Sequence, residues 1–164
     1  MGYGDRTLVG IGGWLAFFVI VMAVFTPLRV AANIAALLSD PQTAAFFGDS
    51  WPIVSGVEIA LNVISVLGGW YLVWRLAKVE LWQTVRIVIA GIWILGPGLN
   101  LVELAFLALI GGAASEVAVA GAPFALIQPF IFAAIWTAYF LMSERVANTY
   151  LRDADPNELD QVFS

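Results

Sequence analysis

Two glutamates and one arginine stand inside apolar stretches of this chain, and they are the side chains best able to do chemistry. Glu58, Glu103 and Arg29 each interrupt a run of apolar residues long enough to cross a bilayer. An ionisable group in hydrocarbon is costly, so each is expected to meet a polar partner or water. The glutamates could serve in acid–base steps, and Arg29 is the expected partner of Glu58, with Glu103 competing for it.

Four carboxamide side chains accompany these charges. Counted inward from the outer ends of the predicted helices at ~1.5 Å per residue, Arg29, Glu58, Glu103 and Gln128 reach similar depths of roughly 8 to 13 Å. Asparagine neighbours accompany them on the first three helices. Because lipid would leave each group without a partner, we expect them to face one another as an intramembrane polar cluster. Two interpretations stay open, namely interhelical glue and a water-filled functional pocket. The predicted cluster comprises Arg29, Asn33, Glu58, Asn62, Asn100, Glu103 and Gln128.

The elements that must position these side chains are membrane helices. The 164 residues are 62% hydrophobic and 12% charged, whereas soluble domains carry about 25% charged residues. A run of about 20 apolar residues crosses the hydrocarbon layer as a helix, and the sequence has four such runs. We therefore predict an all-α polytopic membrane protein, with four transmembrane helices in a bundle. The predicted spans are about 12–38, 52–77, 81–110 and 123–142, within a single domain of residues 1–152 followed by an acidic cytoplasmic tail at 153–164.

Prolines, glycines and polar segments predict where these helices are irregular or end. Pro27 is expected to kink the first span, and the triplet at 96–98 is expected to bend or break the third. Residues 39–51 and 111–122 are predicted to be connections. The fourth span is expected to continue as a polar helix over residues 143–152.

Aromatic and basic residues near the span ends are typical of the membrane–water interface. Trp and Tyr rings suit the headgroup level, and Lys and Arg extend their charges toward water. The predicted lipid-interface anchors are Trp14, Trp51, Trp70, Trp74, Arg75, Lys78, Trp82 and Arg145.

All the basic residues except Arg29 fall at one side of a four-span topology, and the two loops on the other side have none. By the positive-inside rule, we expect both termini in the cytoplasm and the bundle in a bacterial inner membrane. The residues that carry this prediction are Arg6, Arg75, Lys78, Arg86, Arg145 and Arg152.

The chain contains no cysteine and no histidine. Thiol nucleophiles, Cys or His zinc sites and His-ligated haem are therefore excluded. The sequence shows no nucleophile–base pair, metal-ligand set, phosphate-binding loop or nucleic-acid surface. We accordingly predict no enzymatic activity, no cofactor, no metal and no nucleic-acid partner.

Two terminal patches carry a resemblance to a known family. Together with Glu58 and Asn62, they resemble the bacterial domain of unknown function 2569 family of small four-helix membrane proteins. The resemblance covers nearly the whole chain and implies that fold and a membrane location, but no activity. The patches are Gly10-Ile11-Gly12-Gly13-Trp14-Leu15 with Pro27-Leu28 downstream, and Ile135-Trp136, Tyr139-Phe140-Leu141, Ser143, Arg145-Val146 and Thr149-Tyr150.

Two functions are weighed from these observations. The first is an accessory or interaction subunit of a larger membrane complex, which would bind a membrane-protein partner or a second copy of the chain within the lipid bilayer. Small size and little soluble mass favour it. The second is a small transporter, channel-like or ligand-binding membrane protein that uses the polar cluster.

Overall fold

The structure is a computed structural model that describes residues 9–151, and the regular elements of this range are all helices. Four helical stretches are long and apolar enough to cross a membrane. The predicted all-helical class with four such helices is therefore confirmed. Arg6, Arg152 and the predicted tail lie outside the described residues. The four stretches are Trp14–Ser39, Pro41–Lys78, Trp82–Ile110 and Pro123–Met142.

The first two stretches form a helical hairpin. Its outgoing arm is continuous and consists of α1 (Trp14–Ile20), the π-helical segment η1 (Val21–Phe25) and α2 (Thr26–Ser39). Its returning arm consists of α3 (Pro41–Phe47), the 3-10 turn η2 (Gly48–Ser50) and α4 (Trp51–Lys78).

A short link at residues 79–81 leads into the second hairpin. Its outgoing arm consists of α5 (Trp82–Trp93), the π-helical segment η3 (Ile94–Gly98) and α6 (Leu99–Ile110). The returning arm is α7 (Gly112–Met142), which is followed by the short helix α8 (Glu144–Thr149).

The predicted connection at 39–51 is wrong, because most of it is helical. Asp40 caps α3, since its carboxylate accepts hydrogen bonds from the Gln42 amide at 2.9 Å and from the Thr43 hydroxyl. These two hydrogen bonds lower the pKa of Asp40, and the bond from Thr43 has the larger effect. Pro41 occupies the first turn, where its missing N–H costs nothing. The Asp40-Pro41 pair that ends one helix thus also starts the next.

The predicted loop at 111–122 is also wrong, because α7 already begins at Gly112. The segment is rich in alanine, the strongest helix former. The turn is confined to Gly111 and Gly112, whose φ angles of 71° and 85° suit glycine. The polar helix predicted over 143–152 is interrupted at its start, because Ser143 is extended and its hydroxyl caps α8 by accepting from the Val146 amide at 3.4 Å.

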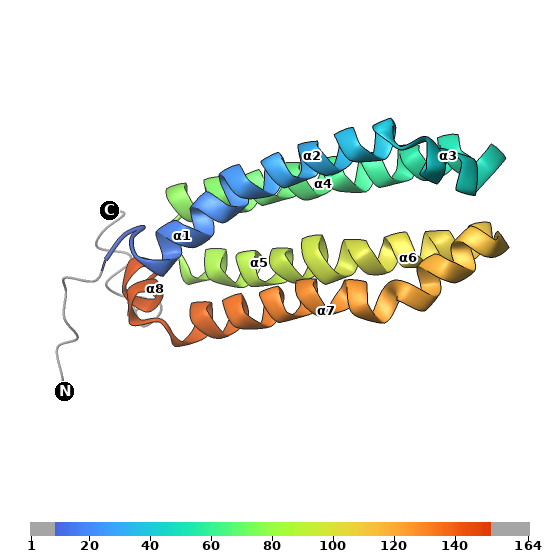
Figure 1. The fold of residues 1–164 in the computed structure, drawn as a ribbon. Helices are drawn as coiled ribbons and strands as arrows, with labels where there is room; N and C mark the ends of the chain where they lie inside the picture. Colours follow the sequence, from blue (N-terminus) through green and yellow to red (C-terminus); the bar gives the residue numbers. More distant parts are fainter. Residues whose placement is uncertain (1–8, 152–164) are drawn as a thin grey trace.

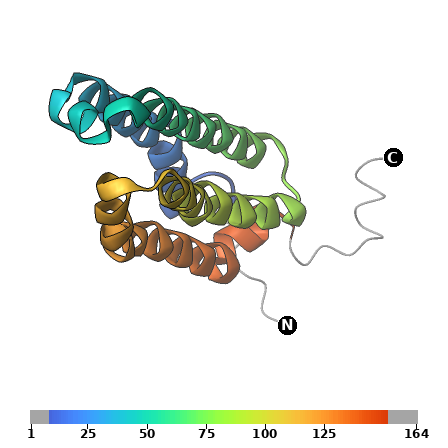
Figure 2. The ribbon, with the colours of Figure 1, turned by 90° about the vertical axis from the view of Figure 1, so that its right-hand side faces the viewer.

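The two hairpins form two layers. Figures 1 and 2 show α1–α2 running along α4 in one layer and α5–α6 running along α7 in the other. Helix α4 also packs against α5 and α6, so it joins the layers. Helix α8 lies at the end of the bundle where α1 begins, and α3 lies at the opposite end (Figure 1).

The hydrophobic core occupies the half of the bundle next to α8. Phe18 of α1 contacts Trp136 and Phe140 of α7, with ring centroids 4.7 and 5.1 Å apart. Gly91 lets Leu72 approach so closely that an added Cβ would lie 2.6 Å from its Cδ1. The other members of the core are Leu15, Met22, Leu76, Val85, Val88, Ile92, Ala133, Val146 and Tyr150.

Proline explains why the outgoing arms contain π-helical segments. Pro27 has no N–H to donate to the carbonyl of Ala23, four residues earlier. The indole of Trp70 donates to that carbonyl instead, at an N···O distance of 3.1 Å. The predicted break at 96–98 is a π-bulge around Pro97, with helix on both sides. Gly98 suits this position, because an added Cβ would make a tight contact of 3.2 Å with the Trp93 carbonyl oxygen.

The two ends of the described chain are bound to each other beside α8. The Gly10 amide donates to the Thr149 hydroxyl oxygen at 2.9 Å. The guanidinium of Arg145 donates to the Val9 carbonyl at 3.3 Å. We call these four residues, Val9, Gly10, Arg145 and Thr149, the terminal clasp. It brings together the two patches that carry the family resemblance.

Tyr150 joins the end of α8 to the end of α4. Its side chain is fully buried, and its hydroxyl donates to the Leu76 carbonyl at 2.8 Å. That carbonyl belongs to the last turn of α4, where helix carbonyls have no donor of their own. Burial is the main reason why the pKa of Tyr150 is raised, and the charges of Glu80 and Tyr139 add to the shift.

Candidate functional site

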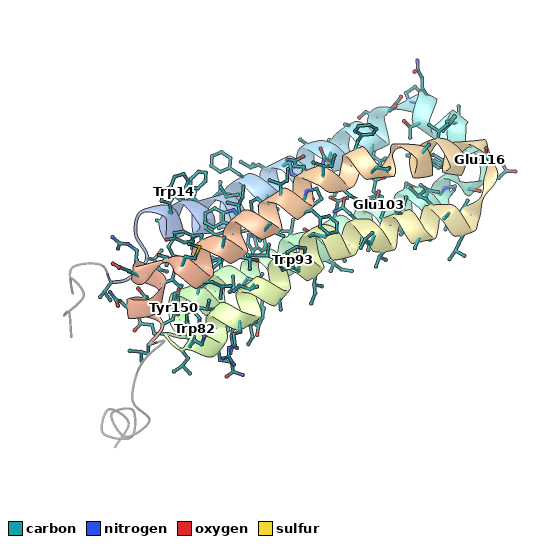
Figure 3. All side chains as sticks on the ribbon, turned by 90° about the horizontal axis from the view of Figure 1, so that it is seen from below. Trp14, Trp82, Trp93, Glu103, Glu116 and Tyr150 are labelled. Carbon is teal, nitrogen blue, oxygen red and sulfur yellow. The ribbon has the colours of Figure 1, made fainter. Side chains whose placement is uncertain are left out.

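A cavity of about 480 Å³ lies between the four long helices. All seven residues of the predicted polar cluster line it. Figure 3 shows Glu103 on the same side of Trp93 as Glu116, with Trp82 and Tyr150 toward the other end. The cavity thus lies beyond the core, in the half of the bundle that contains α2 and α6. Its other lining residues are Val21, Met22, Phe25, Thr26, Leu61, Ser65, Ile92, Leu95, Gly96, Leu99, Ala125, Pro129 and Phe132.

The cavity is closed at the end that faces α8. Met22 and Ile92 line it and are also buried members of the core, with exposed fractions of 7% and 3%. On the first span the lining residues continue from Val21 to Asn33, away from this core. The arrangement is therefore a pocket with an apolar base and not a channel through the described bundle.

The side chains on α2 and α7 form the edge of the pocket. Arg29, Asn33 and Gln128 are exposed, whereas Glu58 and Glu103 are half-buried. Helix α2 packs along α4, and α7 packs along α6, but α2 and α7 have no comparable packing against each other. The pocket therefore opens sideways between α2 and α7, and α4 and α6 form its back wall.

The back wall carries two carboxyl groups. Glu58 on α4 and Glu103 on α6 line the same cavity and interact electrostatically. In the part of the chain that the structure describes, neither carboxylate is joined to Arg29 by an ion pair. The expected pairing of Arg29 with Glu58 is therefore not present. Similar depth did place the three residues around one space, but Arg29 lies at the exposed edge and not against the back wall.

Two amides of the pocket are bonded along their own helices. The Asn62 side-chain amide donates to the Glu58 carbonyl at 2.9 Å, and that of Asn100 donates to the Gly96 carbonyl at 2.8 Å. Interhelical glue would require such groups to bond across to a neighbouring helix. The side-chain bonds of these two amides thus do not cross between helices.

Thr26 and Ser65 also line the pocket, and both are absent from the predicted cluster. Ser65 had a usable signal, because it follows Asn62 by three residues and Glu58 by seven, which places all three on one helix face. The Thr26 hydroxyl, at the start of α2, donates to the carbonyl of Val21 in η1 at 3.0 Å. Thr26 had the same kind of signal, because it precedes Arg29 by three residues and Asn33 by seven within α2.

The pocket offers a ligand acidic side chains on one wall, Glu58 and Glu103, and a basic side chain, Arg29, at its edge. The described residues contain no group of three or more Asp or Glu side chains that could hold a metal ion. The carboxylates of the back wall suit a cation, and the guanidinium of Arg29 suits an anion such as a carboxylate or a phosphate. The pocket thus holds side chains that could contact either sign of charge.

The predicted interface anchors differ in their surroundings. Arg145 belongs to the terminal clasp and covers Gly12, where an added Cβ would lie 2.9 Å from its Nη1. Trp51 stacks on Phe47 at the start of α4, with ring centroids 6.3 Å apart. Contacts with lipid stay a prediction for all eight. The exposed anchors are Trp14, Trp70, Trp74 and Lys78, and the partly buried ones are Trp51, Arg75, Trp82 and Arg145.

Comparison with known proteins identifies the family of the chain. No curated protein and no solved structure matches it. The sequence model of a family described as "Protein of unknown function (DUF2569)" matches residues 8–151. The match includes both terminal patches and the seven predicted residues of the pocket. The chain therefore belongs to the DUF2569 family, as its terminal patches had indicated.

Proposed function

We propose that this protein is an integral membrane protein that binds a small charged ligand in the pocket between its four long helices. The observation that carries the proposal is that Glu58, Glu103 and Arg29 line one cavity without pairing with one another. Charges held inside an apolar bundle need a partner. A bound ligand, together with water, is the partner that this arrangement accommodates.

We place the protein in a bacterial inner membrane with both termini in the cytoplasm. The described basic residues other than Arg29, namely Arg75, Lys78, Arg86 and Arg145, belong to the half of the bundle that contains the terminal clasp. The positive-inside rule assigns that half to the cytoplasm. The pocket then lies in the outer half of the membrane.

A cysteine-labelling experiment tests whether the pocket is wet and negatively charged. The chain has no cysteine, so the Ser65→Cys variant has a single thiol, on the pocket wall. Ala60→Cys is the matched control, because Ala60 is exposed on the same helix and does not line the cavity. Both variants are reconstituted in vesicles and treated with water-soluble methanethiosulfonate reagents, one cationic and one anionic.

We expect Ser65→Cys to be modified and Ala60→Cys to stay unmodified. Each reagent's rate of reaction with Ser65→Cys is divided by its rate with free cysteine. This ratio should be at least roughly tenfold higher for the cationic reagent than for the anionic one, because a cleft lined by one sign of charge concentrates opposite ions. Replacing Glu58 and Glu103 by glutamine should remove this preference. Equal rates for Ser65→Cys and Ala60→Cys would contradict the proposal. Labelling of intact cells from outside tests the orientation.

The accessory-subunit function stays a prediction. The exposed apolar side chains that favour it, such as Leu109 and Phe124, are 87% and 80% exposed. Lipid acyl chains can cover such residues as well as a protein partner can. Mild-detergent extraction followed by mass determination tests this function, and a monomer without a co-purifying protein would count against it.

A further inference from the structure

We infer that the ligand of the pocket is a zwitterion that carries an ammonium group and a phosphate, with the headgroup of an aminophospholipid as the form that best fits the opening. The inference rests on the proposed function and assigns the chemical class of the ligand. In this arrangement Glu58 and Glu103 bind the ammonium, and Arg29 binds the phosphate.

The distribution of charge within the pocket requires a ligand with both signs. The two glutamates lie on α4 and α6, half-buried, and Arg29 lies on α2 at the exposed edge. A singly charged ligand would neutralise one wall and leave the other without a partner. A zwitterion meets both, and an ammonium between the carboxylates also offsets the repulsion between them.

The order of charges matches a lipid that enters from the side. The pocket opens between α2 and α7, toward the space that acyl chains occupy around a membrane bundle. From this opening inward come first Arg29 and then the carboxylates. In an aminophospholipid, the order from the acyl chains outward is first phosphate and then ammonium. The headgroup would therefore point into the pocket and the chains would leave between the helices.

An apolar side chain at the opening supports this direction. Phe25 lines the cavity but is 58% exposed, and it precedes Arg29 by four residues, which places both on the same face. A phenylalanine at this position can contact the first carbons of an acyl chain while Arg29 contacts the phosphate. The volume of about 480 Å³ lies within the range of about 300–1,000 Å³ found for small-molecule sites.

Competition between lipids tests the inference on the unaltered protein. The purified full chain in mild detergent is mixed with phosphatidylethanolamine and phosphatidylglycerol of identical acyl chains, and the retained lipid is measured by native mass spectrometry. Both lipids carry the phosphate, but only the first carries an ammonium. We expect an affinity for phosphatidylethanolamine about tenfold higher, which is the effect of one charge-assisted hydrogen bond. Equal retention would overturn the inference.

Variants assign the two charges of the ligand to residues. The Glu58→Gln, Glu103→Gln double variant should retain both lipids equally, whereas Arg29→Gln should bind both about tenfold more weakly with the preference unchanged. The control variants are Glu116→Gln and Arg86→Gln, since both residues are exposed and neither lines the cavity. A preference that survives the double variant would overturn the assignment of the ammonium to the glutamates.

A soluble competitor distinguishes a lipid from a free zwitterion. Phosphoethanolamine carries the same two charges without acyl chains. If it displaces phosphatidylethanolamine at comparable concentration, the charge chemistry is supported and the physiological source is a free molecule; if it does not, the lipid is the source. The labelling of Ser65→Cys is independent of all these results. A wet, cation-attracting pocket without lipid preference would refute this inference and leave the proposed function intact.

Discussion

Replacing Tyr150 by phenylalanine isolates the contribution of one buried hydroxyl that connects α8 to α4. The phenylalanine ring fills the same space, so the packing of this fully buried side chain is retained. The bond that is lost runs from the hydroxyl to the Leu76 carbonyl at 2.8 Å. A hydrogen bond contributes about 0.5–1.5 kcal/mol net, and a buried acceptor left without a donor costs about 1–3 kcal/mol. We expect a loss of about 1–2 kcal/mol.

The assay is thermal unfolding in detergent, followed by tryptophan fluorescence. For a chain of this length, 1–2 kcal/mol corresponds to a lower midpoint by about 2–8 °C. Tyr71→Phe is the matched control, because Tyr71 is 48% exposed and its hydroxyl only accepts a bond from Arg75 at 3.3 Å. We expect that variant to unfold within about 2 °C of the natural chain, since surface substitutions change stability by no more than about 0.5 kcal/mol. Equal midpoints for Tyr150→Phe and Tyr71→Phe would refute the assignment of a buried, stabilising bond.

Two further perturbations follow from the packing and from the raised pKa of Tyr150. Gly91→Ala should lower stability by about 1–3 kcal/mol, because its Cβ would lie 2.6 Å from the buried Leu72. Gly56→Ala has open space around its Cβ and should raise stability by about 0.4–1 kcal/mol; unfolding midpoints of the two variants decide, and a loss for both would contradict the packing argument. Because the pKa of Tyr150 is raised in the folded state, its contribution should be full below the unfolded pKa of about 10 and fall as the pH rises above that value. Midpoints measured from pH 8 to 11 should therefore fall more steeply for the natural chain than for Tyr150→Phe, and parallel curves would contradict this.

Apolar length predicted the four long helical stretches, because the number of residues needed to cross a bilayer is set by helix geometry. The second span was expected at 52–77, and α4 runs from Trp51 to Lys78. The two connections were missed for a common reason. Asp40-Pro41 stands where a helix ends, and small residues follow Gly112, so both segments resemble connections. Both segments also carry the signals with which a helix begins or continues.

Depth along a helix is easier to predict than rotation about its axis. Counting residues placed all seven polar side chains around one cavity. It could not show that Arg29 would lie at the edge of that cavity, because the π-helical segment before Thr26 turns the rest of the helix by an amount that a regular period does not include. The hydrogen bond from the Trp70 indole to the Ala23 carbonyl was equally unforeseen. That carbonyl needs a donor from another helix only because Pro27 has no N–H to offer it. The depth of a polar residue along its helix is therefore a usable signal for which residues share a cavity. It does not predict which of those residues pair with each other.

The terminal clasp has a consequence for the time course of biosynthesis. Gly10 and its partner Thr149 are 139 residues apart, and ribosomes add about 5–20 residues per second. Thr149 is thus synthesised on the order of ten seconds after its hydrogen-bond partner Gly10. During this interval the first hairpin resides in the membrane with Glu58 and Arg29 lacking the helices that complete their surroundings. The clasp can therefore form only after nearly all of the described chain has been made.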